Sequence, residues 1–397
     1  MRRTLAPALV LVALAACTGG ATPKASSPKA TSSASTVPST APSPTPSSSA
    51  SPKSVRFVVR DSSWISARSG WALGGGSCGT RSCVAVKATH DGGRTWRPVA
   101  APDAGSTSAE PDRLCSASPK RCVQSIRFAN RTVGYAFETG FYVTRDGART
   151  WTHETAPMVL NLEISRGRAY RVVAMSDGCP GPCDVRLEVS DIGSRTWREL
   201  ATPHLDAVAT ELIVHGPRVY FAAHANTAGG ADGAHTRYLR SLDAGRTWSE
   251  FDDPCGEDAN GENDGKAMAA APEGVLSILC TSRMHPTQHN FVVTSTNDAR
   301  TFGRGRELPN AGMVGISVGS ASTIAVSAFR GHGPRVFVSH DGGRTWKVTL
   351  EGPVPDPEGS RYFLGFQDSR TARAAFSGRS IWTTRDAART WTRSNPF

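Results

Sequence analysis

Residues 89–96 read Thr-His-Asp-Gly-Gly-Arg-Thr-Trp, and related units recur along the rest of the chain. The closing tripeptide Arg-Thr-Trp occurs six times and Arg-Thr-Phe once, far more often than composition alone would produce. The units begin at residues 89, 144, 190, 241, 295, 339 and 384, so successive starts are 44 to 55 residues apart. A period near 50 residues is the size of one four-stranded propeller blade. The repeat therefore predicts an all-β protein, a seven-bladed β-propeller with four-stranded blades.

The residue types of the unit favour a tight turn. An Asp side chain accepts hydrogen bonds from the backbone N–H groups that follow it, Gly permits positive φ, and Trp supplies a large apolar wedge between sheets. In the third unit Ile192 stands at the Asp position, and the fifth has Asn297 and Phe302 in place of Asp and Trp, so we expect weaker turns there. The residues predicted to hold these turns are Asp91, Trp96, Asp146, Trp151, Trp197, Asp243, Trp248, Asn297, Phe302, Asp341, Trp346, Asp386 and Trp391.

The pattern Ser/Thr-x-Asp-x-Gly-x-Thr-Trp resembles the Asp-box, or BNR repeat, of sialidases, sortilin-type receptors, xyloglucanases and photosystem II assembly-factor propellers. The resemblance covers roughly residues 55–397. It implies that each box lies in the hairpin between the third and fourth strands of a blade and that its role is structural. We therefore predict Asp-box turns at one corner of every blade.

Short apolar runs between the boxes predict the remaining strands. In the first blade the first three strands are residues 64–66, 70–73 and 84–86. The fourth strand, residues 96–99, starts at the last residue of the box. Residues 55–59 are left over as an extra strand. This strand either closes the ring against the last blade or leads into the first blade.

The N-terminal 54 residues predict export and anchoring. Residues 1–16 combine a basic start with an apolar run too short to span a bilayer, which is typical of a signal peptide. The run ends in Leu14-Ala15-Ala16-Cys17, which resembles the lipobox of bacterial lipoproteins and implies a lipid on Cys17. Residues 18–54 are almost entirely Ser, Thr, Pro, Ala and Gly, so residues 17–54 form a lipidated Cys and a disordered tether. We expect a lipid-anchored protein on the extracytoplasmic side of the cell membrane.

Eight cysteines remain besides Cys17. An even number in an exported protein favours disulfides over metal ligands, and no Cys-x-x-Cys pair supports the competing zinc site. Proximity in the sequence suggests the pairs Cys78 with Cys83, Cys115 with Cys122, Cys179 with Cys183, and Cys255 with Cys280.

The blade plan separates two faces. The Asp-boxes and the turns between first and second strands share one face, where we expect no binding site. The opposite face, called the loop face below, should carry the long or cysteine-bearing loops at residues 74–83, 101–122, 175–183, 224–236, 251–266 and 281–289. Long loops stapled to a rigid scaffold are where binding usually resides, so the loop face is the predicted binding face.

Three polar features have a functional and a plain interpretation. His224, His235, His285, His289 and His332 fall on the loops of the later blades, either as metal ligands or as solvated polar residues. Residues 258–265 alternate oxygen-bearing side chains like a calcium loop, but the closing Glu is missing, so a solvated acidic loop is favoured. The box arginines form a ring for anionic polymers, or simply suit exposed turns: Arg94, Arg149, Arg195, Arg246, Arg300, Arg344 and Arg389.

The net charge of +11 does not indicate nucleic-acid binding. Five of the 45 basic residues precede residue 55, and seven more are the box arginines spread around the ring. A phosphate-binding groove needs a clustered basic footprint. We expect no nucleic-acid partner, no cofactor and a monomeric chain.

Two functions remain open. The first is a non-enzymatic scaffold that binds an envelope protein or glycan through the loop face, as the likeness to assembly-factor propellers implies. The second is a sialidase-like exo-glycosidase. Its arginine-containing start motif has only a poor match at residues 55–58, and sialidases have six blades. Acidic residues such as Glu138, Glu163 and Asp368 are available, but nothing in the sequence marks them as catalytic.

Overall fold

The computed structural model describes most of the chain after residue 56. The described stretches are residues 57–78, 81–104, 121–175, 183–203, 205–224, 236–258, 261–282, 289–308, 312–330, 333–352, 363–376 and 380–394. They all belong to one compact unit, Ser54–Phe397, which is separate from Met1–Lys53. The predicted signal peptide, the lipidated Cys17 and the tether lie outside the described residues. No helix in the described stretches is long and apolar enough to cross a membrane.

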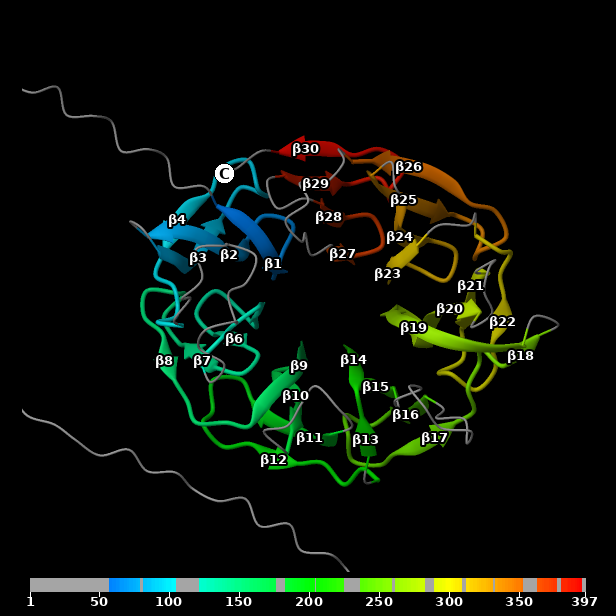
Figure 1. The fold of residues 1–397 in the computed structure, drawn as a ribbon, viewed down its shortest axis with the longest axis horizontal. Helices are drawn as coiled ribbons and strands as arrows, with labels where there is room; N and C mark the ends of the chain where they lie inside the picture. The colour runs from blue at the N-terminus through cyan, green and yellow to red at the C-terminus, as the bar shows by residue number, and fades with distance from the viewer. Residues whose placement is uncertain are drawn as a thin grey trace, which may run out of the picture. The chain divides into compact units, whose positions relative to one another are not determined.

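Seven antiparallel sheets surround a common axis, which confirms the predicted seven-bladed propeller (Figure 1). Blades one and two contain β1 (Val58–Trp64), β2 (Gly70–Cys78), β3 (Arg81–Thr89), β4 (Arg97–Val99), β5 (Ser125–Phe128), β6 (Gly134–Phe137), β7 (Phe141–Thr144) and β8 (Thr152–His153). Blades three and four contain β9 (Met158–Ser165), β10 (Arg168–Ala174), β11 (Cys183–Asp191), β12 (Arg198–Glu199), β13 (Leu205–Ala207), β14 (Ala209–His215), β15 (Arg218–His224), β16 (Arg237–Ser241) and β17 (Ser249–Phe251). Blade five contains β18 (Glu257–Asp258), β19 (Gly261–Ala271), the one-turn helix η1 (Pro272–Gly274), β20 (Val275–Ser282), β21 (Asn290–Ser295) and β22 (Gly303–Arg304). Blades six and seven contain β23 (Gly312–Val318), β24 (Ile324–Arg330), β25 (Gly333–Ser339), β26 (Lys347–Glu351), β27 (Phe363–Phe366), β28 (Ala372–Phe376), β29 (Ser380–Thr384) and β30 (Thr392–Ser394).

Five blades have four strands, and two gain a short fifth strand, β13 in the third blade and β18 in the fifth. Strands β1, β9, β14, β19, β23 and β27 lie nearest the axis, whereas β4, β8, β12, β26 and β30 lie at the perimeter (Figure 1). Each blade thus runs outward from the axis, as the sequence period predicts.

The first strand differs from its sequence prediction. Val58 to Trp64 form one strand, so residues 58–59 lead into the first blade and residues 64–66 are not a strand of their own. Pairing with β2 shifts register between Val59 and Asp61, and this bulge breaks the alternation that sequence reasoning relies on. Within residues 57–394 as far as they are described, the first and last blades share no strand. Phe363 of the last blade instead packs on the cluster of Phe57, Val59 and Ala72, which closes the ring.

The core is distributed over the seams between neighbouring blades. The aromatic residue of each box packs into the seam shared with the preceding blade. The indole N–H of Trp151 donates to the carbonyl of Ala100 at 2.8 Å, and that of Trp346 donates to Arg306 at 3.2 Å. In these boxes the predicted apolar wedge therefore also fastens the turn to the chain leaving the blade before it, whereas Trp96 donates to Gly93 of its own box.

The Asp-box turn has the hydrogen bonds that its residue types predict. Asp91 Oδ1 accepts from the backbone N–H groups of Arg94 and Thr95, each at 2.9 Å. The Thr95 hydroxyl donates to Asp91 Oδ2 at 2.6 Å, and these bonds hold the pKa of Asp91 well below its usual range. Thr89 adds a contact that the sequence did not suggest, since its hydroxyl accepts from the N–H of Gly93 and donates to Asp91. Asp146, Asp243, Asp341 and Asp386 repeat the arrangement.

The third box has a different turn. Asp191 is mostly solvent-exposed, at 86%, and the N–H of Thr196 donates to Ser194 Oγ instead of a carboxylate. In the other boxes two successive residues have positive φ, as Gly92 and Gly93 do, whereas here only Gly193 does. Ile192 cannot accept these bonds, so the turn relaxes to another conformation. In the fifth box the Asn297 amide still accepts from Thr301 N–H at 3.0 Å.

We predict that the double variant Ile192→Asp, Ser194→Gly raises the free energy of unfolding by about 1–2 kcal/mol. The new carboxylate can accept two backbone N–H groups, and glycine lets the fifth box position adopt positive φ without strain. Urea denaturation followed by circular dichroism measures the change. Ser194→Gly alone is the control and should not stabilise, and a double variant no more stable than the wild type would contradict this account of the turn.

Where the structure describes residues 258–265, they lie in strands and not in the loop that the sequence favoured; residues 259 and 260 and the side chains that would bind calcium lie outside the described part. Glu257 pairs with Glu262 and Asp258 pairs with Gly261, which makes a hairpin between β18 and β19. The strand β19 continues through residues that pair with β20. Among the described residues, no group of three His, Cys, Asp or Glu side chains is placed to hold a metal ion.

Candidate functional site

A cavity of about 330 Å³ lies between the inner strands of blades one, two, three and seven. Ser62, Ser63 and Trp64 end β1, Phe128 ends β5 and Phe366 ends β27, and all five line it. These strand ends lead into the turns between first and second strands, which share a face with the Asp-boxes. The cavity therefore lies on the side where the sequence predicted no binding site.

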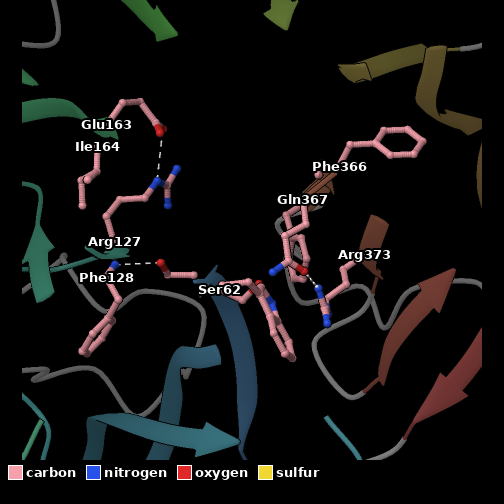
Figure 2. Close-up of a pocket in the computed structure, with 12 residues that line it drawn as sticks. Ser62, Arg127, Phe128, Glu163, Ile164, Phe366, Gln367 and Arg373 are labelled. Carbon is pink, nitrogen blue, oxygen red and sulfur yellow. Dashed lines mark hydrogen bonds and ion pairs between the residues drawn. The ribbon is translucent and has the colours of Figure 1, made fainter. Parts of the chain in front are cut away.

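Arg127 and Glu163 form one side of the cavity (Figure 2), and Asp61 pairs with the same arginine from outside the cavity lining. Arg127 of β5 donates from Nη1 to Asp61 Oδ2 at 2.7 Å and from Nε to Glu163 Oε1 at 3.1 Å. Burial disfavours its charge, but the two carboxylates outweigh burial and raise the pKa of Arg127. Burial likewise raises the pKa of Glu163, against the opposing effect of Arg127. The group carries two carboxylates for one guanidinium.

The opposite side is formed by Arg373 and Gln367 of the last blade (Figure 2). Arg373 is 2% exposed and its guanidinium lies over the Trp64 ring, 3.4 Å from the centroid. It donates to the Gln367 side-chain oxygen and, at 3.0 Å, to the carbonyl of Ala67. Burial first, and then the nearby charge of Arg385, lower the pKa of Arg373 to about 9, so it remains a cation at neutral pH.

Side chains of the inner strands fix the spacing of the blades around the cavity. Asp61 Oδ2 accepts from the N–H of Ile126 at 2.9 Å, and Ser63 Oγ accepts from that of Phe128 at 2.7 Å. Between blades six and seven, Ser317 Oγ accepts from the N–H of Phe366 at 2.7 Å. An inner strand has an unpaired edge, and these bonds satisfy its donors. They also hold the walls of the cavity in register.

Glu211 on β14 makes a similar contact on the far side of the ring, outside the cavity. The N–H of Met268 on β19 donates to its carboxyl group, while its Oε2 is buried with no hydrogen-bond partner. Burial raises the pKa of Glu211 to about 8. The carboxyl is therefore mostly protonated at neutral pH.

The predicted disulfides are partly visible. Cys255 and Cys280 form one, as proposed. Cys83, Cys122 and Cys183 are also disulfide-bonded. Their predicted partners Cys78, Cys115 and Cys179 have side chains outside the described part of the chain, so these three pairings stay predictions. The bonded cysteines all lie at loop-face ends of strands or in loops on that face.

The other sequence candidates that the structure describes do not come together. His224 Nδ1 contacts Thr236 Oγ1 at 3.1 Å and His289 pairs with Glu307, on different blades, while His235, His285 and His332 lie outside the described residues. Glu138 accepts from Gln124, and Asp368 caps its own turn by accepting from Arg370 and Thr371. The seven box arginines are exposed, as expected for the turns that carry them.

The sequence offers Glu163 as an available carboxylate but does not point to Asp61, Arg127, Arg373 or Glu211. One signal was present: Arg127 interrupts the apolar run of residues 125–128 at a position on an inner strand. A charged residue at such a position faces either the axis or a seam. The sequence does not say which residues from other blades meet it there.

Comparisons with known proteins agree with the fold. No protein-family model and no curated protein matches the sequence. The solved structure of YCF48 bound to D1 peptide is similar, with 15% identity, a TM-score of 0.52, and coverage of 84% of this chain and 94% of the other. YCF48 from Cyanidioschyzon merolae gives 15% identity and a TM-score of 0.51 over 84% of this chain and 97% of the other. The chain is a seven-bladed β-propeller similar in fold to YCF48.

Proposed function

We propose that this protein is a membrane-anchored, extracytoplasmic scaffold that binds an envelope protein or glycan through its loop face. The observation that carries the proposal is the position of the disulfides. The described cysteines that are bonded lie at loop-face ends of β3, β11 and β20 or in loops beside β5 and β18. Covalent staples fix loop conformation before binding, which reduces the entropy lost on association. YCF48 supports a protein partner, because that propeller has a solved structure with a peptide bound.

Site-specific photo-crosslinking in intact cells tests the binding face. Asp252 and Arg246 are both exposed and flank β17 at its loop-face and Asp-box ends. We expect a photoreactive residue at 252 to give a discrete adduct, and one at 246 to give none. An adduct only from position 246 would overturn the loop-face assignment, and no adduct from either position would overturn the scaffold itself.

The lipid anchor has a separate test. If Cys17 carries the lipid, Cys17→Ala should move the exported protein from the membrane fraction to the soluble fraction after cell breakage. Cys255→Ala together with Cys280→Ala is the control for loss of a cysteine without loss of the anchor. Membrane association that survives Cys17→Ala would reject lipidation at this residue.

A glycosidase is the second candidate, favoured by one observation. Glycosidases need one protonated and one ionised carboxyl group. Glu163, whose pKa is raised, lines the cavity, and Asp61 forms an ion pair with the same arginine, Arg127. Against it, Arg127 holds both carboxylates. Hydrolysis of a fluorogenic sialoside by the purified protein, lost in Glu163→Gln, would establish this activity in place of the scaffold role.

A further inference from the structure

The cavity on the Asp-box side has walls of opposite charge. Arg127 and Glu163 line one wall, and Arg373 lines the facing wall with one positive charge (Figure 2). Asp61 does not line the cavity but pairs with the same guanidinium, so the group of Asp61, Arg127 and Glu163 carries one excess negative charge. The two walls come from different ends of the chain and meet only because the ring closes. This site is distinct from the loop face and goes beyond the scaffold function.

Arg373 is a buried cation without an anionic partner. Among the described residues it forms no ion pair, and its guanidinium contacts the neutral oxygens of Gln367 and Ala67 and the ring of Trp64. Its Nε is buried with no hydrogen-bond acceptor. After burial, the largest electrostatic influence on it is another cation, Arg385, and the carboxylate of Asp368 opposes that influence only in part and without forming an ion pair among the described residues. Burying a charge is costly unless it is paired, so an anionic group from a ligand would supply what this wall lacks.

Glu163 offers the complementary feature. Its side chain is 30% exposed, and Arg127 is the hydrogen-bond donor that it contacts among the described residues, through one of its two oxygens. Asp61, in contrast, also accepts from the N–H groups of Ser62 and Ile126. Acceptor capacity and excess negative charge therefore both remain at Glu163. An ammonium group fits this position.

The remaining lining is apolar or neutral and sets the size of the ligand. Ile164, Phe363 and Phe366 supply apolar surface, and Ser62 and Gln367 supply neutral polar groups. The volume of about 330 Å³ is near the lower end for small-molecule sites. A short chain of methylene groups would lie against the apolar surface while its two ends reach the two walls.

We propose that this cavity binds a small zwitterion, with its carboxylate against Arg373 and its ammonium group against Glu163. The two charged ends of a zwitterion form favourable contacts with both walls at once. An anion or a cation alone forms a favourable contact with one wall and none with the other. The separation of the two walls then selects the length of the ligand. Amino acids with the amine at the end of the chain have this chemistry.

Isothermal titration calorimetry of the full chain in detergent tests the proposal with glycine, β-alanine, 4-aminobutyrate, 6-aminohexanoate and 8-aminooctanoate. We expect saturable binding that peaks at one chain length. The singly charged analogues of that length, the alkanoate and the alkylamine, should bind about tenfold or more weakly, since each lacks one charged contact. Binding that ignores chain length, or an alkanoate that binds as tightly as the zwitterion, would overturn the zwitterion site.

Variants identify the walls. Glu163→Gln should reduce affinity for the best zwitterion to that of the alkanoate, and Arg373→Gln should abolish binding. Glu199→Gln is the matched control, because Glu199 is an exposed carboxylate on the outer strand of the same blade as Glu163. Because Glu163 is partly exposed, we expect Glu163→Gln to fold. This variant therefore still tests the site if Arg373→Gln does not fold. Affinity unchanged in Glu163→Gln would show that the proposed ammonium contact is wrong.

Discussion

Trp71→Ala is expected to lower the free energy of unfolding by about 4 kcal/mol. Trp71 is 2% exposed on β2, and its ring stacks on Phe128 of the next blade with centroids 3.7 Å apart. Truncation removes the aromatic pair and leaves a void in the seam between blades one and two, where Ile126 and Val86 are also buried. The surrounding strands are held by their ladders and cannot collapse into that space. Urea denaturation followed by far-ultraviolet circular dichroism measures the loss.

The variant Trp71→Phe distinguishes the contribution of the stacked ring pair from the cost of the void. Phenylalanine keeps an aromatic ring against Phe128 and removes the indole N–H, which has no hydrogen-bond partner in the described structure. We expect a loss of about 1–2 kcal/mol, because phenylalanine is smaller than tryptophan but leaves a much smaller void than alanine does. Equal losses in the two variants would mean that the seam does not depend on this ring pair.

Raising the pH from 5 to 9 is expected to destabilise the propeller through Glu211. The folded state holds the Glu211 proton up to a pKa of about 8, whereas the unfolded chain releases it near 4.5. Folding therefore binds a proton between these values, so the stability contributed by protonated Glu211 is present below pH 4.5 and is lost as pH rises to about 8. The linkage amounts to about 4 kcal/mol over this range.

Chemical denaturation at several pH values checks the effect. Glu211→Gln should flatten the slope between pH 5 and 8, because its amide does not ionise. Glu250→Gln is the matched control, since Arg237 lowers the pKa of exposed Glu250 by hydrogen bonding and its removal cannot flatten a slope of this sign. A wild-type slope that persists in Glu211→Gln would place the titrating group elsewhere.

The sequence was sufficient to predict the blades but not the cavity. The box pattern is local, because Asp91 and Thr95 meet within one turn, and seven repeats of that turn determine the number of blades. Most blade seams are also local, since the box aromatic packs against the blade just before its own in the sequence; the seam of Trp96 with the last blade is the exception. The first strand was misplaced because the bulge at Arg60 disrupts its alternation.

The cavity depends on contacts between distant parts of the chain. Glu163 and Arg373 lie more than 200 residues apart in the sequence and face each other only after the last blade packs against the first. Neither residue belongs to a recognisable motif, and Arg373 sits in an apolar strand where its charge gives no hint of a cavity. The prediction that the cysteine-bearing loops lie on the loop face depended on loop length and cysteine positions, which are local features. The described bonded cysteines lie on that face.

The absence of a strand shared between the first and last blades of the described ring has a mechanical consequence. Tension on the chain N-terminal to Val58 enters the propeller through β1, the inner strand of the first blade. That load is carried in shear by the β1–β2 ladder and by side-chain contacts such as Phe57 and Val59 on Phe363. No strand from the C-terminal end shares the load, so the ring should yield under force by extracting β1 before any other blade is disturbed.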